Sequence, residues 1–521
     1  MSSHLSGLEI LSRPGPENCT AGWRARARDP TSILLLRSTL YHTRAMRGSL
    51  TLPIAALFSL LANAKVGKHR AAARLTNADV GKHHSEVTLK VFATYWPQWH
   101  ATPLNDYWFG KGYTDWDLLC LYKKAHGNEM MNPLPPPKGL GWYDLNDKSV
   151  RRRQALLAKE YGVHGFAYYH YWFARDESWG RPKSWKEDEP WGADMDETQM
   201  KLLDDDDGEP NIPFYFVWAN QAFVWKWNTW KEGRVSRLRS NQVQVPQTYP
   251  KDSWRSHFDY LLPFFKHPNY HKIDGMPVFG VYIQTPPELD VMYRLFRTWA
   301  KEAGLPGLFI LQYVWPEKKY AKRTKDEGID ILRNTRYANA VQDFGYQSGF
   351  GARRSCSPMT HQRNWSYGLM TSFDSRSRYG EYMDWPWFKR KAPLIEPDAP
   401  TDFERGLNMV VNQSLVDAIR LGEKEKMVLV VSFNEWTEQA ILEPSDKHGL
   451  GFLEALRSTL KYYRQYRHSG PRHAWMQVAG EIPQLTTCAG GGGDGGQLGN
   501  RFIFDKVGKL FRAFFSMHPY Y

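Results

Sequence analysis

Two carboxylates follow a short apolar run near the C-terminal end of the chain. Residues 427–433 (MVLVVSF) are rich in valine, which is typical of a strand buried on both faces. Glu435 and Glu438 come directly after it, and carboxylates are rarely buried without a reason. Parallel α/β folds place their reactive groups where such strands end. We therefore predict that Glu435 and Glu438 are catalytic.

The three-residue spacing of these glutamates predicts how they would act together. If the chain turns into a helix after Phe433, both side chains project from one face, with Cβ atoms roughly 5–6 Å apart. Two carboxyl groups that close do not both ionise readily, so one keeps its proton near neutral pH. Glycosidic bond cleavage needs a neighbouring acid and base, and a close pair favours retention of configuration. The alternative is a helix N-terminus whose dipole the two glutamates complement.

Other short apolar runs end in the same way, in aromatic and polar residues. We expect strands at Val87–Tyr95, Gly165–Phe173, Pro213–Ala219, Pro277–Ile283, Leu308–Tyr313 and Met427–Phe433, with two more near Tyr337–Val341 and Tyr367–Ser372. Helical spacing predicts helices at Val150–Tyr161, Trp254–Lys266, Leu289–Ala303, Asp402–Leu421 and Leu450–Tyr466. This alternation indicates an α/β fold, a (β/α)8 TIM barrel with flexible N- and C-terminal tails.

Side chains at the strand ends complete the predicted site. The expected substrate-binding residues are Tyr95, His100, Tyr169, Trp218, Asn220, Asn434 and Trp436. Trp and Tyr offer flat apolar faces with a polar edge, and the chain's 22 Trp and 28 Tyr therefore favour a carbohydrate ligand. His100 has an alternative role as a loop histidine. Tyr169 and Trp218 have an alternative place in the core, because neighbouring strand residues face opposite sides.

Charge and cysteine content exclude several classes of ligand. The formal net charge is +13, but most of the excess Lys and Arg lies in residues 1–90 and 468–521. The part between them has no basic stripe, so we expect no nucleic-acid partner. Cys19, Cys120, Cys356 and Cys488 have no CxxC or metal-ligand spacing. We expect no disulfide framework, no metal and no organic cofactor.

Residues 1–86 form a predicted N-terminal extension. Within them, a basic start at Met46 precedes the apolar run 50–61 and an Ala-Asn-Ala site. These features are typical of a secretory signal peptide, here at 46–64, and the run is too short to span a membrane. We expect Met46 to be the functional start and the protein to enter the secretory pathway or be secreted.

The predicted catalytic domain covers residues 87–467, and the tail covers 468–521. The tail contains a Gly-rich linker at 489–496. Beyond the linker, apolar residues fall on one helical face near Lys and Arg, which predicts weak contact with a membrane surface. Docking of this segment onto the barrel, or disorder, is favoured over that contact. We expect the protein to be a monomer.

Several further motifs occur in a fixed order between residues 90 and 465. They are the aromatic segment 95–116, Tyr143-Asp144-Leu145, Gln154–Gly162, Gly165–Phe173, Trp218-Ala219-Asn220, His257–Phe265, Asn269-Tyr270, Asp274–Val278, Asn434–Glu438 and Leu442-Glu443-Pro444. This order resembles the glycosyltransferase WbsX family, whose barrel is similar to glycoside hydrolase family 99. The resemblance implies a catalytic barrel over this part of the chain.

For chemistry, the resemblance implies a Glu-x-x-Glu pair like that of endo-α-mannosidases. Carried over, Glu435 is the base on the sugar 2-hydroxyl, giving a 1,2-anhydro intermediate, and Glu438 is acid and then base at the leaving group. Three positions differ from these relatives. Thr437 stands where the mannosidases have His, and Gln221 stands where the WbsX pattern has Glu. The family's Trp-Asp-Asn…Pro-Arg segment is only loosely matched by Met383–Pro386.

The leading prediction is a carbohydrate-active enzyme that cleaves an α-linked glycan with retention, in the manner of an endo-mannosidase. Its partner would be an oligosaccharide or polysaccharide substrate. Two alternatives stay open, a glycosyltransferase of glycan biosynthesis and a catalytically silent barrel that binds glycans. A transferase would need a nucleotide-sugar donor, whereas a silent barrel would bind sugar and release no product.

Overall fold

The computed structural model describes residues 87–174, 191–204, 211–225, 242–282, 289–314, 338–344, 365–378, 394–395 and 400–466. The predicted N-terminal extension with its signal peptide and the C-terminal tail from residue 468 onward lie outside the described residues. So does Met383–Pro386.

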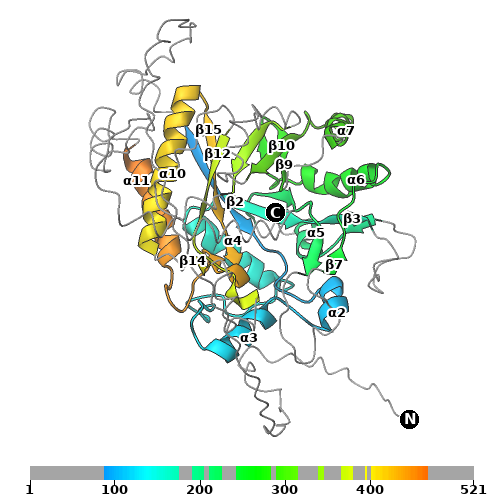
Figure 1. Cartoon of the computed structure of the whole chain (residues 1–521). Helices are drawn as coiled ribbons and strands as arrows, with labels where there is room; N and C mark the ends of the chain where they lie inside the picture. The colour runs from blue at the N-terminus through cyan, green and yellow to red at the C-terminus, as the bar shows by residue number, and fades with distance from the viewer. Residues whose placement is uncertain are drawn as a thin grey trace, which may run out of the picture. The chain divides into compact units, whose positions relative to one another are not determined.

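Eight parallel strands form a closed barrel (Figure 1). They are β1 (Thr88–Tyr95), β2 (Gly165–His170), β5 (Phe214–Trp218), β9 (Met276–Val281), β10 (Phe309–Val314), β11 (Ala340–Asp343), β12 (Trp365–Met370) and β15 (Glu425–Val431). Their order around the barrel is β10-β11-β12-β15-β1-β2-β5-β9, and β9 pairs back onto β10. Every predicted strand has its counterpart here, and the (β/α)8 prediction is confirmed.

The predicted helices are also present, with ends that shift by a few residues. They are α4 (Lys148–Glu160), α6 (Ser253–Lys266), α7 (Leu289–Glu302), α10 (Pro400–Leu421) and α11 (Gly451–Tyr466). The Asp147 side chain caps α4 by accepting a hydrogen bond from the Ser149 N–H. Gly162 follows α4 with a φ of +93°, and a Cβ there would lie 2.8 Å from a methyl carbon of Leu460. The glycine therefore allows α4 to end against α11.

The Trp-rich segment after β1 contains two short helices. It forms α2 (Pro103–Phe109) and α3 (Trp116–His126), and the Thr102 side chain caps α2. Large apolar side chains of this segment pack on residues that follow β2, namely Leu104, Trp108, Phe109 and Tyr113 against Tyr171 and Phe173. Burial of these aromatic faces stabilises the segment above the carboxyl ends of the strands.

Cys120, on α3, is disulfide-bonded, contrary to the expectation of no disulfide framework. Spacing along the chain does not report which cysteines meet in space, because bridging depends on Cα separation and side-chain direction in the fold. The structure therefore adds a cross-link that the sequence spacing did not indicate.

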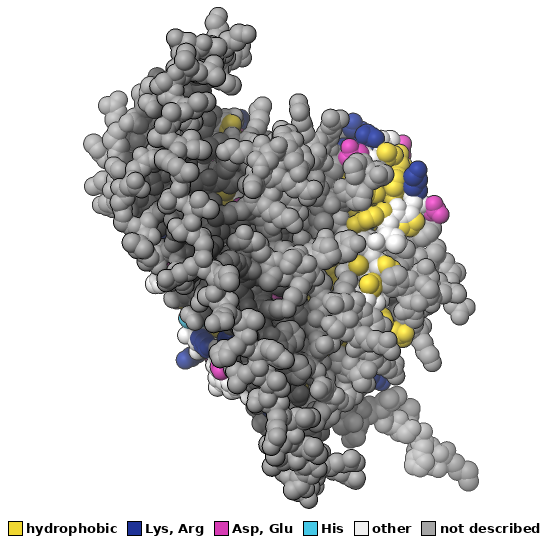
Figure 2. All heavy atoms as spheres, viewed as in Figure 1, with side chains coloured by type: hydrophobic (Ala, Val, Ile, Leu, Met, Phe, Trp, Pro, Cys, Tyr) yellow, Lys and Arg dark blue, Asp and Glu magenta, His cyan; other side chains and the backbone are white. Residues whose placement is uncertain are grey.

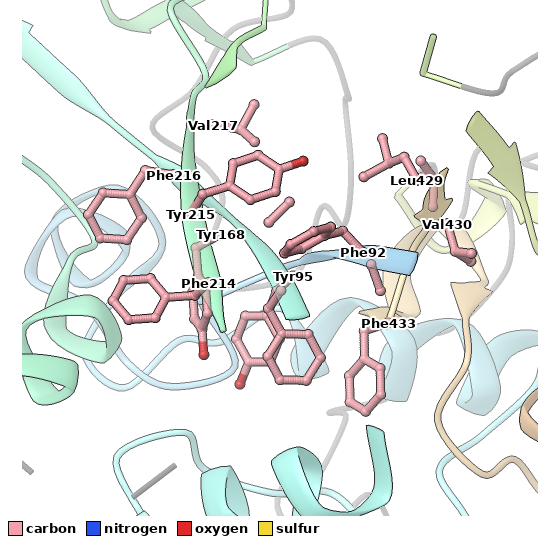
Figure 3. Close-up of a cluster of buried hydrophobic side chains, with 14 of the residues drawn as sticks. Phe92, Tyr95, Tyr168, Phe214, Tyr215, Phe216, Val217, Leu429, Val430 and Phe433 are labelled. Carbon is pink, nitrogen blue, oxygen red and sulfur yellow. The ribbon is translucent and has the colours of Figure 1, made fainter. Parts of the chain in front are cut away.

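Buried aromatic rings gather on and around the barrel strands (Figure 3). Phe92 lies edge-on to Tyr215, with ring centroids 5.1 Å apart. The Tyr215 hydroxyl is 2.8 Å from the Tyr313 hydroxyl, so buried polar edges are paired inside the core. The core thus rests on ring packing with a few internal hydrogen bonds.

Exposed large apolar side chains are few among the described residues. They are Leu156, Met200, Val243 and Val291. Figure 2 shows apolar side chains interleaved with acidic and basic ones along the right-hand edge of the molecule. In the described part of the chain, no helix combines the length and apolarity needed to cross a bilayer.

Candidate active site

The segment that carries the two glutamates is a hairpin and not a helix. Asn434–Glu435 forms β16, which pairs antiparallel with β17 (Ala440–Ile441), and Trp436–Glu438 forms the 3₁₀ turn η6. The helix considered after Phe433 is thus a single 3₁₀ turn and not an α-helix. The pairing of β16 with β17 occupies backbone groups that a helix would have used. In a 3₁₀ turn, residues three apart lie on the same side, so the spacing still brings the glutamates together.

Both glutamates contact one guanidinium. Arg378 Nη2 lies 3.4 Å from Glu435 Oε1 and 3.5 Å from Glu438 Oε1. Thr437 Oγ1 also donates to Glu435 Oε1, at 2.6 Å. The Glu435 side chain is 7% exposed and that of Glu438 is 28% exposed. The two carboxylates thus form one site in which Glu438 is the more open to solvent.

The electrostatics of the pair agree with the expectation from its spacing. Burial raises the pKa of Glu435 to about 8; Arg378 opposes the rise, and Glu438 adds to it. Burial also raises the pKa of Glu438, again opposed by Arg378. A pair of this kind keeps a proton near neutral pH and can offer one acid and one base.

Asp115 is a third carboxylate at this site, and sequence reasoning missed it. It is buried and accepts a hydrogen bond from Trp96 Nε1 at 2.9 Å. Burial raises its pKa, while Arg378 and the Trp96 hydrogen bond lower it. The available signal was an aspartate inside a segment otherwise rich in aromatic residues.

Two partly exposed rings stand beside the carboxylates. Trp96 and Tyr169 meet edge to face, with ring centroids 5.7 Å apart at 73°. Burial raises the pKa of Tyr169 well above its usual value, and Tyr282 and Glu438 add to the rise. The structure therefore places Tyr169 near the glutamate pair and adds Trp96 to the candidate site.

Asn434 and Trp436 are buried residues that support the turn carrying the glutamates. Asn434 is fully buried; its Oδ1 accepts from the Trp96 backbone N–H at 2.7 Å, and its Nδ2 donates to the Trp96 carbonyl at 3.0 Å. Trp436 is 1% exposed, and its Nε1 donates to Glu443 Oε2 at 2.7 Å. Such burial leaves no face for a sugar. We therefore correct their predicted role from substrate binding to support of the turn.

Tyr95 belongs to a buried network around Glu443. Its hydroxyl donates to Gln154 Oε1 at 2.7 Å, and Gln154 Nε2 donates to Glu443 Oε1 at 2.7 Å. The Tyr143 hydroxyl donates to Glu443 Oε2 at 2.8 Å. Burial raises the pKa of Glu443 to about 7, and its three hydrogen bonds oppose the rise. Tyr95 is 1% exposed, so its predicted sugar contact is replaced by a link in this network.

The structure does not bring the other predicted binding residues to the pair. His100 is buried, with Nε2 3.3 Å from Glu197 Oε2. Trp218 is 2% exposed and lies edge-on to His257 of α6. Asn220 is 2% exposed, and its carbonyl accepts from the Tyr249 hydroxyl at 2.8 Å. These residues pack the strand ends against neighbouring elements, which is the alternative that strand alternation allows for Trp218.

Comparison with known proteins now identifies the family. Residues 91–190 and 192–456 match the model of the family described as glycosyltransferase WbsX. The chain belongs to the glycosyltransferase WbsX family. The description of this family names a carbohydrate-active enzyme, in line with the coarser part of the prediction.

Relatives of this WbsX member include the uncharacterized protein WxcX of two Xanthomonas campestris strains. One is 26% identical over 387 residues, which are 71% of this chain and 49% of that protein. The other is 26% identical over 388 residues. The chain thus spans about half the length of these relatives.

Solved structures that resemble the chain include an endo-α-mannosidase of glycoside hydrolase family 99 from Bacteroides thetaiotaomicron. It is 14% identical and has a TM-score of 0.42, covering 73% of this chain and 99% of that one. A family 5 glycoside hydrolase from Streptomyces cattleya is 12% identical and has a TM-score of 0.33, covering 73% and 81%. Scores this low carry no argument about chemistry.

Arg378 is the second functional residue that sequence reasoning missed. The WbsX segment Trp-Asp-Asn…Pro-Arg was compared with Met383–Pro386. The order of an aromatic residue, Asp and then Arg also occurs at Phe373, Asp374 and Arg378, at the exit of β12. That order was the available signal.

The described residues offer acids and one guanidinium for chemistry. Among them, no group of three or more His, Cys, Asp and Glu is arranged to hold a metal ion. The arrangement can transfer protons between an acid and a base beside aromatic rings. It can also stabilise positive charge that develops on a bound sugar.

Proposed function

We propose that this WbsX member is a retaining glycosidase that cleaves an α-linked glycan at an internal bond. The observation that carries the proposal is the pair Glu435 and Glu438 at the exit of β15, with both carboxylates in contact with one Arg378 nitrogen. Carboxyl groups of retaining glycosidases lie roughly 5–5.5 Å apart, closer than those of inverting enzymes. A shared guanidinium nitrogen supports the closer spacing.

Access to solvent supports different roles for the two glutamates. Glu435 is the more buried, and Thr437 and Arg378 converge on its Oε1, as suits a base held in one position. Glu438 is the more exposed, as suits a group that exchanges protons with a leaving group and then with water. Because the pair titrates as one unit, we assign these roles from access and contacts rather than from single pKa values.

In the proposed reaction, Glu435 removes the proton of the sugar 2-hydroxyl. That oxygen attacks the anomeric carbon as the glycosidic bond breaks, giving a 1,2-anhydro sugar, and Glu438 protonates the leaving oxygen. Water then opens the ring at the anomeric carbon while Glu438 takes its proton. Glu435 returns a proton to the 2-oxygen. Two inversions at the anomeric carbon give net retention.

The proposed substrate is an oligosaccharide or polysaccharide with α-linked, mannose-like units. The partly exposed rings of Trp96 and Tyr169 offer flat apolar faces beside the acids. We further propose action in the secretory pathway or outside the cell, as the signal-like segment suggests. The disulfide of Cys120 supports an oxidising compartment.

A glycosyltransferase is the second candidate, and the family description is the observation that favours it. Such an enzyme would transfer a sugar from a nucleotide donor to a glycan. It would bind that donor in the absence of any glycan, whereas a hydrolase needs water as its only co-substrate.

The test incubates the full chain with a panel of α-mannosides and other α-linked glycans. Products are separated by chromatography, and the anomer formed first is assigned by NMR. Release of a sugar with retained configuration, lost in Glu438→Gln, is the expected result. Product that appears only with a nucleotide sugar would support the transferase. Sugar binding without product, unchanged in Glu435→Gln and Glu438→Gln, would support a silent glycan-binding barrel.

A further inference from the structure

Neighbours of Arg378 hold it against the turn that carries the glutamates, in addition to the contacts of its own side chain. It ends the 3₁₀ turn η4 (Arg376–Arg378), which follows β12 and β13 (Phe373–Asp374). The buried Ser377 hydroxyl donates to the Thr437 carbonyl at 2.7 Å, and the Ser372 hydroxyl donates to the Gln439 carbonyl. The β12 exit is therefore fastened to the turn that carries both glutamates.

The neighbouring arginine, Arg376, has a different task. Its Nε donates to Asp374 Oδ1 at 3.0 Å and its Nη2 donates to Asp374 Oδ2 at 2.7 Å, and Asp374 is fully buried. Its Nη1 lies 3.0 Å from Glu129 Oε2. Fork-shaped pairing of this kind fixes geometry as well as charge. Arg376 thus folds η4, and the same turn presents the guanidinium of Arg378 to the catalytic pair.

The charge balance explains why a cation is needed there. Three acids, Asp115, Glu435 and Glu438, lie within the electrostatic reach of one Arg378. The phenols of Tyr169 and Tyr171 face the same acids and add no positive charge. Without a cation, carboxyl groups this close and this buried would hold their protons, and the site would have no base.

We infer that Arg378 is a positioning residue that lets Glu435 and Glu438 share one site as ionised base and protonated acid. This inference rests on the proposed function for its meaning in catalysis. Its electrostatic part stands without that function. An arginine suits the task because a guanidinium stays charged at every working pH and offers a planar fork.

The test follows the carboxyl carbons of glutamate by NMR, in full-length protein labelled at those carbons, over pH 4 to about 10. Glu435→Gln and Glu438→Gln identify the two signals. Removing an opposite charge within about 4–6 Å raises a carboxyl pKa by about 1–3 pH units, so Arg378→Met should move the titration of the pair upward by that amount. Arg378→Lys keeps the charge and should move it less.

Activity provides a second readout if the glycosidase proposal holds. Because the base must be ionised, the acidic limb of the pH–rate profile should move to higher pH in Arg378→Met. The rate at pH 6 should fall at least about tenfold, while KM changes little, and added guanidinium should restore part of it. Arg376→Lys, the control in the same turn, should alter thermal stability and leave the acidic limb in place.

The outcomes separate the two proposals. If the pair titrates at the wild-type pH in folded Arg378→Met, the inference is overturned. If the methionine variant does not fold, the same result in the neutral variant Arg378→Gln overturns it. A shifted titration in a protein that cleaves no glycan would uphold the role of Arg378 and count against the glycosidase. An equal shift of the acidic limb in Arg376→Lys would also overturn the inference, because the effect would then come from folding of the turn.

Discussion

The exits of β15 and β2 carry polar side chains at the same end of the barrel, yet only the exit of β15 has the features of a candidate reactive site. After β15, Glu435 and Glu438 share a guanidinium, and Glu438 is 28% exposed. At the end of β2, His170 Nε2 lies 2.9 Å from His257 Nε2, and both rings are buried. Trp172 stacks on His257, with centroids 4.6 Å apart, and seals the pair.

Burial acts on both pairs in the same physical sense, since it opposes charge. It raises the pKa of Glu435 to about 8 and lowers the pKa of His170 to about 3. The difference lies in what surrounds the groups. The acids have a cation and a route to solvent, whereas the histidines have aromatic walls. A polar residue at a strand end thus becomes a candidate for catalysis only where charge partners and access coincide.

The largest expected effect comes from the acids. Glu438→Gln and Glu435→Gln should each lower kcat about 10²–10⁴-fold, the usual share of acid–base catalysis. In the folded pair the pKa of Glu435 rises to about 8 from an ordinary 4.5, so the pair as a unit binds an extra proton between these values. Stability should therefore fall as pH rises from about 4.5 to 8. Thermal melts of Glu435→Gln should show a weaker fall of stability with rising pH. If both variants kept activity close to wild type, the exit of β15 would be no more reactive than the exit of β2, and the comparison would fail.

The network behind the turn should give the next largest effect, on folding. Glu443→Leu leaves the donors of Gln154, Tyr143 and Trp436 buried without their acceptor, which should cost at least about 3 kcal/mol of unfolding free energy. The swap Glu443→Gln with Gln154→Glu keeps every hydrogen bond and moves the charge to the partner. It should stay within about 1 kcal/mol of wild type in urea unfolding. Equal losses of unfolding free energy in Glu443→Leu and in the swap would contradict this account, because the position of the charge would then matter more than the number of hydrogen bonds kept.

The histidine pair should reveal itself through acid sensitivity. The folded pKa of His170, about 3, lies below its ordinary 6.5, so the unfolded state binds the extra proton between these values. Stability from this group is present above pH 6.5 and is lost as pH falls toward 3. His170→Gln keeps a hydrogen-bonding side chain that does not titrate. It should reduce the loss of unfolding free energy between pH 6.5 and 4 by at least about 1.4 kcal/mol; the same slope in both proteins would contradict this account.

The smallest effect should distinguish two tryptophans at the strand ends. Trp96→Phe removes the indole hydrogen bond to Asp115 beside the acids and should raise KM about tenfold, equivalent to about 1.4 kcal/mol. Trp218→Phe should leave KM unchanged within error, because Trp218 is buried against α6. Steady-state kinetics on one glycan would measure both. A raised KM in Trp218→Phe would return that residue to the binding site.

Much of the fold was legible in the sequence, since apolar runs of strand length alternate with amphipathic helices. The strands β11 and β12 were the least defined, and β11 has only four residues, which carry little periodicity. The glutamate pair was legible for a similar reason, as its three-residue spacing places it on one side of any tight turn. The type of that turn was not, because the choice between helix and hairpin depends on the pairing of β16 with β17.

Tertiary structure alone decided which residues surround the pair. Arg378 and Asp115 lie far from the glutamates in sequence, and strand closure brings them together. It also decided which strand-end residues face away: Tyr95, Asn434 and Trp436 turned inward to satisfy buried hydrogen bonds. The sequence by itself determined a barrel with two acids at one strand end. The position of Arg378 between the two acids follows from packing, because only the closed barrel brings the segments of Asp115, Arg378 and the glutamates together.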